Sequence, residues 1–292
     1  IFVDLWYSSL ARCDYYCVLI VECVHDQKKV FSIANYLMYN RIVCALPTSG
    51  TANELSEKFA DFFVDKIAKI KASFDEPSDD HHDDIEQPPP VLDILAPTTE
   101  AELRKIIMGG NSKSCSLDPI PTQLLKSSLE ILLPTLTKIV NTSLSSANVP
   151  KSLKSATVTP LLKKSSLDKE DFKNYRPVSN LPYLSKLIEK VAVKRLNTHM
   201  TQYNLHEYFQ SAYRMYQSTE TALLRVHSDI LQAVDSKKCV YLVLLDQSAA
   251  FDTVDHTILL RRLEDTVGIT GSTLEWCQSY FADRSQSVQV LG

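Results

Sequence analysis

The sequence predicts a mixed α/β protein of the α+β type, because three kinds of pattern occur in it. Amphipathic helical spacing recurs along the chain, β-rich segments interrupt the helices, and one unbroken apolar run is suited to a strand buried on both faces. That run covers residues 239–245 and ends in the carboxylate of Asp246. The chain has 292 residues, of which 45% are hydrophobic, and this is enough apolar material for a sizeable core.

The predicted elements follow one another along the chain. Residues 51–74 have the spacing of an amphipathic helix, with lysines towards the C-terminal end where they favour the helix dipole. Thr99 and Glu102 have the spacing of a capping box that opens a second helix. Apolar residues from 124 to 144 predict a helix bent at Pro134. The later elements are a β-rich segment at 156–162, helices at 184–196, 222–234, 257–267 and 274–281, and a strand that starts at 287.

An acidic and proline-rich tract at residues 75–97 is the clearest domain boundary. Its composition cannot bury apolar surface, so we expect an exposed linker. The tract separates an N-terminal extension, residues 1–74, from a larger region, residues 98–292. The net charge of −4 divides at the same place, because residues 1–97 carry 8 Lys and Arg against 16 Asp and Glu, whereas the remainder is net positive.

Composition narrows the function classes. Residues 150–225 hold 13 basic and 6 acidic residues, which is the footprint of a polyanion binder, although a solvated lysine-rich surface has the same composition. Neither of the common glycine-rich nucleotide fingerprints occurs. Seven cysteines without a C-x-x-C pair favour a reduced protein of the nucleus or cytoplasm. No apolar run is long enough to span a bilayer and no signal peptide is visible, so we expect neither a membrane partner nor secretion.

Asp246 is the strongest candidate for chemistry. Many phosphoryl-transfer enzymes present a Mg²⁺ ligand at the C-terminal end of a buried strand, because the strand fixes the carboxylate while its end stays open to the ion and the triphosphate. The alternative is that this carboxylate caps the turn that follows.

The residues around Asp246 belong to a wider pattern of five ordered blocks. In chain order these are LDPIP (117–121), TPLLKK (159–164), NYRPVSNL (174–181), QSAYR with STE (210–214 and 218–220), and LLDQSAAFDTVDH (244–256). The last block resembles the first catalytic motif of non-LTR retrotransposon reverse transcriptases, and the others resemble segments of the same family in the same order. The closest likeness is to LINE-like elements of the jockey, chicken-repeat or L2 kind.

The resemblance implies a partial right-hand polymerase, with the fingers and the first part of the palm. It makes Asp246 the first metal-binding aspartate, with the backbone carbonyl at Gln247 completing part of the shell of a second Mg²⁺ ion. Phe251 matches the aromatic gate that lies against the sugar of the incoming nucleotide, unless it is a core aromatic. Asp252 and Asp255 are not assigned to metal, since Asp255 has the position of an N-cap.

The remaining matched positions are expected to contact substrates. Arg176 and either Lys163 or Lys164 match the fingers cations that bind a triphosphate, with solvated surface as the alternative. Gln210, Tyr213 and Arg214 match positions that contact the template or support the nucleotide pocket. The implied partners are an RNA template, a DNA primer and a deoxynucleoside triphosphate.

The sequence also departs from the family pattern. A Gly-Pro-Gln-Gly-like loop and an aromatic-x-Asp-Asp hairpin do not occur, so we expect a chain truncated before the second catalytic motif and inactive alone, because one carboxylate cannot hold two Mg²⁺ ions. Gln247 replaces an apolar residue, and Met215-Tyr216-Gln217 stands where a Pro-Gly turn is common. Two alternatives remain: a non-catalytic nucleic-acid-binding remnant, and an inert pseudogene product.

Overall fold

A computed structural model describes residues 46–48, 50–74, 88–110 and 115–290. The chain divides into two units, residues 1–48 and 49–292, and every element below belongs to the second unit. Most of the predicted N-terminal extension and the acidic half of the predicted linker lie outside the described residues. The α-helices are α3 (Ala52–Ala72), α4 (Glu100–Gly109), α5 (Thr122–Ser127), α6 (Leu129–Ser145), α7 (Tyr183–Gln202), α8 (Thr219–Asp235), α9 (His256–Asp265) and α10 (Gly271–Phe281).

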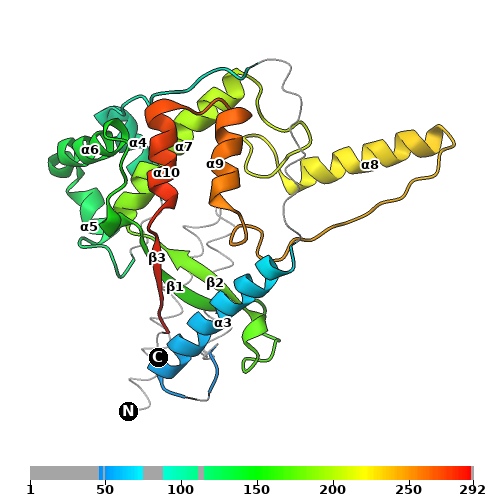
Figure 1. Cartoon of the computed structure of the whole chain (residues 1–292), viewed down its shortest axis with the longest axis horizontal. Coiled ribbons are helices and arrows are strands. Elements are labelled where there is room, and N and C mark those ends of the chain that lie inside the picture. The colour runs from blue at the N-terminus through cyan, green and yellow to red at the C-terminus, as the bar shows by residue number, and fades with distance from the viewer. Residues whose placement is uncertain (1–45, 49, 75–87, 111–114, 291–292) are drawn as a thin grey trace, which may run out of the picture. The chain divides into compact units, whose positions relative to one another are not determined.

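Three short strands form one mixed sheet, in the order β2-β1-β3. Strand β1 (Ser155–Leu162) pairs antiparallel with β2 (Tyr175–Asn180) and parallel with β3 (Ser285–Val288). Two 3₁₀ turns precede β1 and β2, at Lys151–Leu153 and Phe172–Asn174. Figure 1 shows the sheet beside the helices, and this mixture confirms the predicted α+β class.

The main core lies among the helices rather than on the sheet. Leu103 and Ile107 of α4, Val140 of α6 and Val191 of α7 are fully buried there, together with Trp276 of α10. Helix α7 starts directly after β2, and its first backbone N–H, on Tyr183, donates to the carboxylate of Asp118 at 2.6 Å. The LDPIP block therefore anchors the N-terminus of α7.

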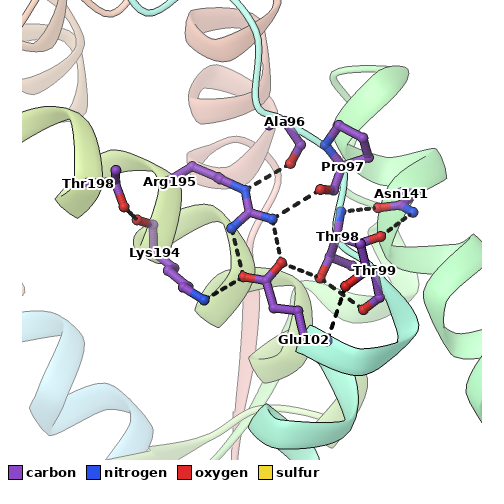
Figure 2. A network of polar contacts seen from close by, with 9 residues as sticks. All are labelled: Ala96, Pro97, Thr98, Thr99, Glu102, Asn141, Lys194, Arg195 and Thr198. Carbon is purple, nitrogen blue, oxygen red and sulfur yellow. Dashed lines mark hydrogen bonds and ion pairs between the residues drawn. The ribbon is translucent and has the colours of Figure 1, made fainter.

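A polar network fastens α7 to α4 and to the segment before α4 (Figure 2). The Arg195 guanidinium donates to both carboxylate oxygens of Glu102, at 2.8 and 2.7 Å, and also to the carbonyls of Ala96 and Pro97. Lys194 pairs with the same carboxylate at 2.7 Å, and the Thr98 hydroxyl donates to it at 2.9 Å. These hydrogen bonds, led by the one from Arg195, lower the pKa of Glu102 well below its usual range, although desolvation opposes them.

Helix α3 packs against the sheet through aromatic rings. Phe59 is fully buried and meets Tyr175, the first residue of β2, edge to face at 4.9 Å between ring centroids. The ring centroid of Phe172, just before β2, lies 4.5 Å from that of Phe59. The predicted helix at 51–74 is therefore confirmed, and Thr51 caps it through a complete capping box.

The structure differs from the sequence prediction at residues 88–97. This half of the predicted exposed linker is partly buried, with Leu95 only 3% exposed. Leu92 pairs with Ile269 in a parallel bridge, and the carbonyl of Asp93 accepts the N–H of Thr273 in the first turn of α10. Pairing with distant backbone decides the structure of this segment more than its composition does. The reason is that its carbonyl groups accept hydrogen bonds from N–H groups at the N-terminus of α10, which have no partner within the helix.

Three other predictions also need correction. Residues 239–245 form no strand and are exposed, with Leu245 at 90%, because no other strand among the described residues pairs with them. The helix at 124–144 is interrupted at Ser128, whereas Pro134 lies inside α6. The capping box at Thr99 is half formed: Thr99 accepts the N–H of Glu102, but the Glu102 side chain is bound to Arg195 instead.

A substitution at Gly268 tests how residues 88–97 pack against the rest of the chain. The φ of Gly268 is +76°, and a Cβ there would lie 2.1 Å from the carbonyl oxygen of Pro90. We predict that Gly268→Ala lowers the free energy of unfolding by about 3 kcal/mol, from left-handed strain plus the clash. Gly109→Ala is the matched control, since nothing lies within 4 Å of its Cβ, and it should stay within about 1 kcal/mol of the parent in urea unfolding. Equal effects of the two changes would contradict the packing described.

The Glu102 network predicts a pH-dependent contribution to stability. Because the folded-state pKa of Glu102 is lowered, its stabilisation is present above the unfolded pKa of about 4.3 and is lost as the pH falls towards the folded value. Glu102→Gln should cost about 2 kcal/mol at pH 7, and its difference from the parent should shrink in acid. Glu130→Gln, at the exposed Arg104 pair, should change little in the same chemical-denaturation series. A pH-independent Glu102→Gln difference would contradict this assignment.

Candidate functional site

The last sequence block forms a turn followed by a capped helix. The backbone N–H groups of Asp252 and Thr253 both donate to the carbonyl of Ala249, which itself has a left-handed φ of 53°. Asp255 then caps α9, since one of its carboxylate oxygens accepts the N–H groups of Thr257 and Ile258. These backbone hydrogen bonds lower the pKa of Asp255. The N-cap expected at Asp255 is confirmed.

This turn shares a pocket of about 500 Å³ with two strands and helix α3. Ala249 and Asp252 of the turn line it opposite Pro177 and Ser179 of β2, and Gln286 of β3 also takes part. The pocket therefore joins the third and fifth sequence blocks, which lie about 70 residues apart in the chain. Helix α3 supplies the remaining wall, including the cations Lys66 and Lys71.

The fourth block reaches the same turn through an aromatic contact. The rings of Tyr213 and Phe251 meet edge to face, with 6.0 Å between centroids, and both side chains are largely exposed. The loop that carries Tyr213 is held by Arg214, which donates to the carbonyls of Glu207 and Gln210. Gln210 in turn donates to the carbonyl of Ala212. The structure thus brings together two of the predicted site residues, Tyr213 and Phe251.

The register of β1 and β2 gathers the predicted fingers cations at one end of this strand pair. Arg176 stands opposite Leu161, and the N–H of Lys163 donates to the carbonyl of Asn174. Arg176 and Lys164 are exposed, whereas the Lys163 ammonium donates to the carbonyl of Lys173 at 2.7 Å. Arg176 directly precedes the pocket-lining Pro177, but because side chains alternate along a strand it points to the opposite face of β2 from Pro177 and Ser179.

Asp246 and Gln247 are exposed in the irregular segment before the turn. A carboxylate is the donor that Mg²⁺ prefers, and this ion usually takes one or two carboxylates with water and phosphate oxygens. No group of three or more His, Cys, Asp or Glu residues gathers within the described ranges. The described donor set is thus incomplete for a two-metal centre.

The departure from the family pattern after Arg214 has a structural counterpart. Tyr216 has a φ of 61°, in the left-handed region that glycine adopts without strain. A Pro-Gly turn at Met215-Tyr216 would place its glycine at this position. Tyr216 therefore holds a backbone conformation that glycine would adopt with less strain.

Sequence reasoning missed two contributors to these surfaces. Lys66 and Lys71 of α3 line the pocket, but their spacing indicated only favourable charges near a helix end. Arg225 of α8 stacks on Tyr208 and Phe209, at 4.5 and 4.7 Å from the ring centroids. No local signal predicts either arrangement, because each depends on contacts between distant segments.

Comparison with known proteins agrees with these blocks. Residues 162–290 match the family described as reverse transcriptase (RNA-dependent DNA polymerase). The probable RNA-directed DNA polymerase from transposon BS of Drosophila melanogaster is 33% identical over 141 residues, which are 48% of this chain and 15% of that protein. Residues 162–290 are therefore similar to the reverse transcriptases of mobile elements.

Two further relatives from Drosophila melanogaster support this assignment. The RNA-directed DNA polymerase from mobile element jockey is 34% identical over 122 residues, 42% of this chain and 13% of that protein. The probable RNA-directed DNA polymerase from transposon X-element is 27% identical over 216 residues, 74% of this chain and 23% of that protein. The chain thus spans less than a quarter of the length of each of these three relatives.

The reverse transcriptase region, residues 162–290, begins at the last residue of β1 and contains every predicted site residue. Helices α3 to α6 precede it in the chain, and α3 forms one wall of the pocket. Within the described ranges, no helix combines the length and apolar character needed to cross a lipid bilayer.

Proposed function

We propose that residues 98–292 form the fingers and the first part of the palm of an RNA-directed DNA polymerase, preceded by an extension at 1–74 and a linker at 75–97. Such an enzyme transfers deoxynucleotides to a primer 3′ end under the direction of an RNA template. The observation that carries the proposal is convergence: β2 and the turn after Asp246 line one pocket, and the loop at Tyr213 contacts Phe251 of the same turn, although these sequence blocks are far apart.

Each candidate site residue has the role that its side-chain chemistry suits. Asp246 would supply a carboxylate to Mg²⁺, and the carbonyl at Gln247 would add a second oxygen donor. Phe251 lies against the sugar of the incoming nucleotide. Arg176 binds its triphosphate, since a guanidinium takes two phosphate oxygens at once. Lys163 and Lys164 add positive charge from the same strand end, while Gln210, Tyr213 and Arg214 hold the loop against template and nucleotide.

Asp246 alone is insufficient for polymerisation. Two Mg²⁺ ions need further carboxylates, and no aromatic-x-Asp-Asp run occurs among these 292 residues. The second candidate function follows from the excess of basic residues at 150–225: by itself the chain binds nucleic acid without incorporating nucleotides.

A primer-extension assay tests the catalytic assignment. The isolated chain should give no templated incorporation, whereas a fusion to a segment carrying the aromatic-x-Asp-Asp hairpin of this family should incorporate deoxynucleotides in Mg²⁺. In the fusion, Asp246→Asn should lower the rate at least about a hundredfold, because it removes a ligand that stabilises the transition state by several kcal/mol.

Asp235→Asn is the matched control, because Asp235 is an exposed aspartate at the end of α8 that does not line the pocket. It should retain most of the activity of the fusion. Incorporation by the isolated chain would contradict the need for additional carboxylates. Equal losses from the two substitutions, in fusions with the same thermal unfolding, would contradict the role of Asp246.

A further inference from the structure

One face of α7 carries a groove of about 900 Å³ with a positive lining. Lys186, Lys190 and Lys194 recur at four-residue spacing, so they lie on the same face of the helix. Glu189 is the one acidic residue of the lining, and its carboxylate already accepts the hydroxyl of Tyr280 at 3.1 Å. This α7 groove therefore presents a row of three cations.

The local charge stays positive when the neighbouring network is included. Glu102 pairs with Lys194, but Arg195 binds the same carboxylate in two places. Two cations thus face one carboxylate there. Among the described residues, neither Lys186 nor Lys190 has an ion-pair partner, and both line the groove.

The far end of the α7 groove is lined by Met215, which belongs to a loop rich in exposed aromatic side chains. We call residues 205–217 the aromatic loop. Its ring residues are 70–92% exposed, and they are Tyr208, Phe209, Tyr213 and Tyr216. Exposed apolar groups gathered in this way mark interaction sites in soluble proteins.

Contacts from two arginines hold the aromatic loop in place without covering its rings. The guanidinium of Arg225 lies over the rings of Tyr208 and Phe209, and it donates to the carbonyl of Tyr208 at 3.5 Å. Arg214 closes the loop by donating to two of its carbonyls. These contacts orient the Tyr208 and Phe209 rings while leaving them 72% and 70% exposed to a ligand.

We propose that the α7 groove and the aromatic loop form one binding track for a single strand of nucleic acid. Proteins that hold single strands combine a positive groove for the phosphates with aromatic rings on which bases stack, and both occur here side by side. Lys186 and Lys190 contact the phosphates, and Tyr208 and Phe209 stack on bases. The identity of the ligand rests on the proposed function; the track needs no metal, and neither its lysines nor the Tyr208 and Phe209 rings line the pocket at Pro177, although Tyr213 of the same loop contacts Phe251.

Fluorescence anisotropy with the full 292-residue chain tests the track, using labelled 12-nucleotide oligo(U) and oligo(dT) without Mg²⁺. Lys186→Gln with Lys190→Gln should weaken binding and lower the salt-dependence slope by about 1.4, since each phosphate contact contributes about 0.7 on single strands. Tyr208→Leu with Phe209→Leu should weaken binding at least about fivefold with an unchanged slope, because stacking involves no counterion release. Lys138→Gln with Lys151→Gln, exposed positions outside the groove, is the control of equal charge and should change little.

The substituted side chains lie at the surface, and thermal unfolding should confirm that each variant keeps the parental fold. Equal losses from the groove and control lysine pairs would overturn the track, leaving only a general charge effect. An unchanged affinity in the aromatic variant would overturn it as well, as would a preference for a 12-base-pair duplex. These results would leave the polymerase assignment intact, because that assignment is tested by incorporation and by Asp246.

Discussion

The bond between Arg195 and Glu102 is the constraint on which the arrangement of the site depends. It joins α7 to α4, and the same guanidinium holds the carbonyls of Ala96 and Pro97. The carboxylate is only 17% exposed, so its interaction with Arg195 is less screened by water than that of a surface pair. Because the Asn180 end of β2 leads into α7, fixing this helix also helps to fix the strand that carries Arg176 at its other end.

The helices were largely predictable because their signals are local. Thr51 and Asp255 cap helices with side chains close to them in sequence, and the apolar spacing of α7 and α10 matches the faces that are buried. The predictions failed where pairing between distant segments decides the outcome. Residues 88–97 are proline-rich and follow an acidic tract, yet Leu92 pairs with Ile269. Residues 239–245 have the composition of a buried strand but have no neighbouring strand among the described residues.

The predictions for the site divide in the same way, between local motifs and contacts that join distant segments. Sequence motifs identified Arg176, Tyr213, Asp246 and Phe251, and the structure brings Tyr213 and Phe251 into contact. Motifs did not reveal that α3 walls the pocket or that Arg225 braces Tyr208 and Phe209, because no fixed spacing relates these residues. The resulting surfaces have different chemistry. The pocket at Pro177 and Ser179 adjoins the turn that follows Asp246, whereas the exposed rings and the lysines along α7 form the proposed track for an extended strand.

Photocrosslinking tests most directly whether these exposed side chains contact nucleic acid. An RNA oligonucleotide that contains 5-iodouridine, which crosslinks to aromatic rings, would be irradiated with the full chain and the modified residues identified by mass spectrometry. The account predicts crosslinks to the aromatic loop, at Tyr208, Phe209, Tyr213 or Tyr216. Crosslinks at Phe74, a 58% exposed ring after the end of α3, with none in the aromatic loop, would contradict it.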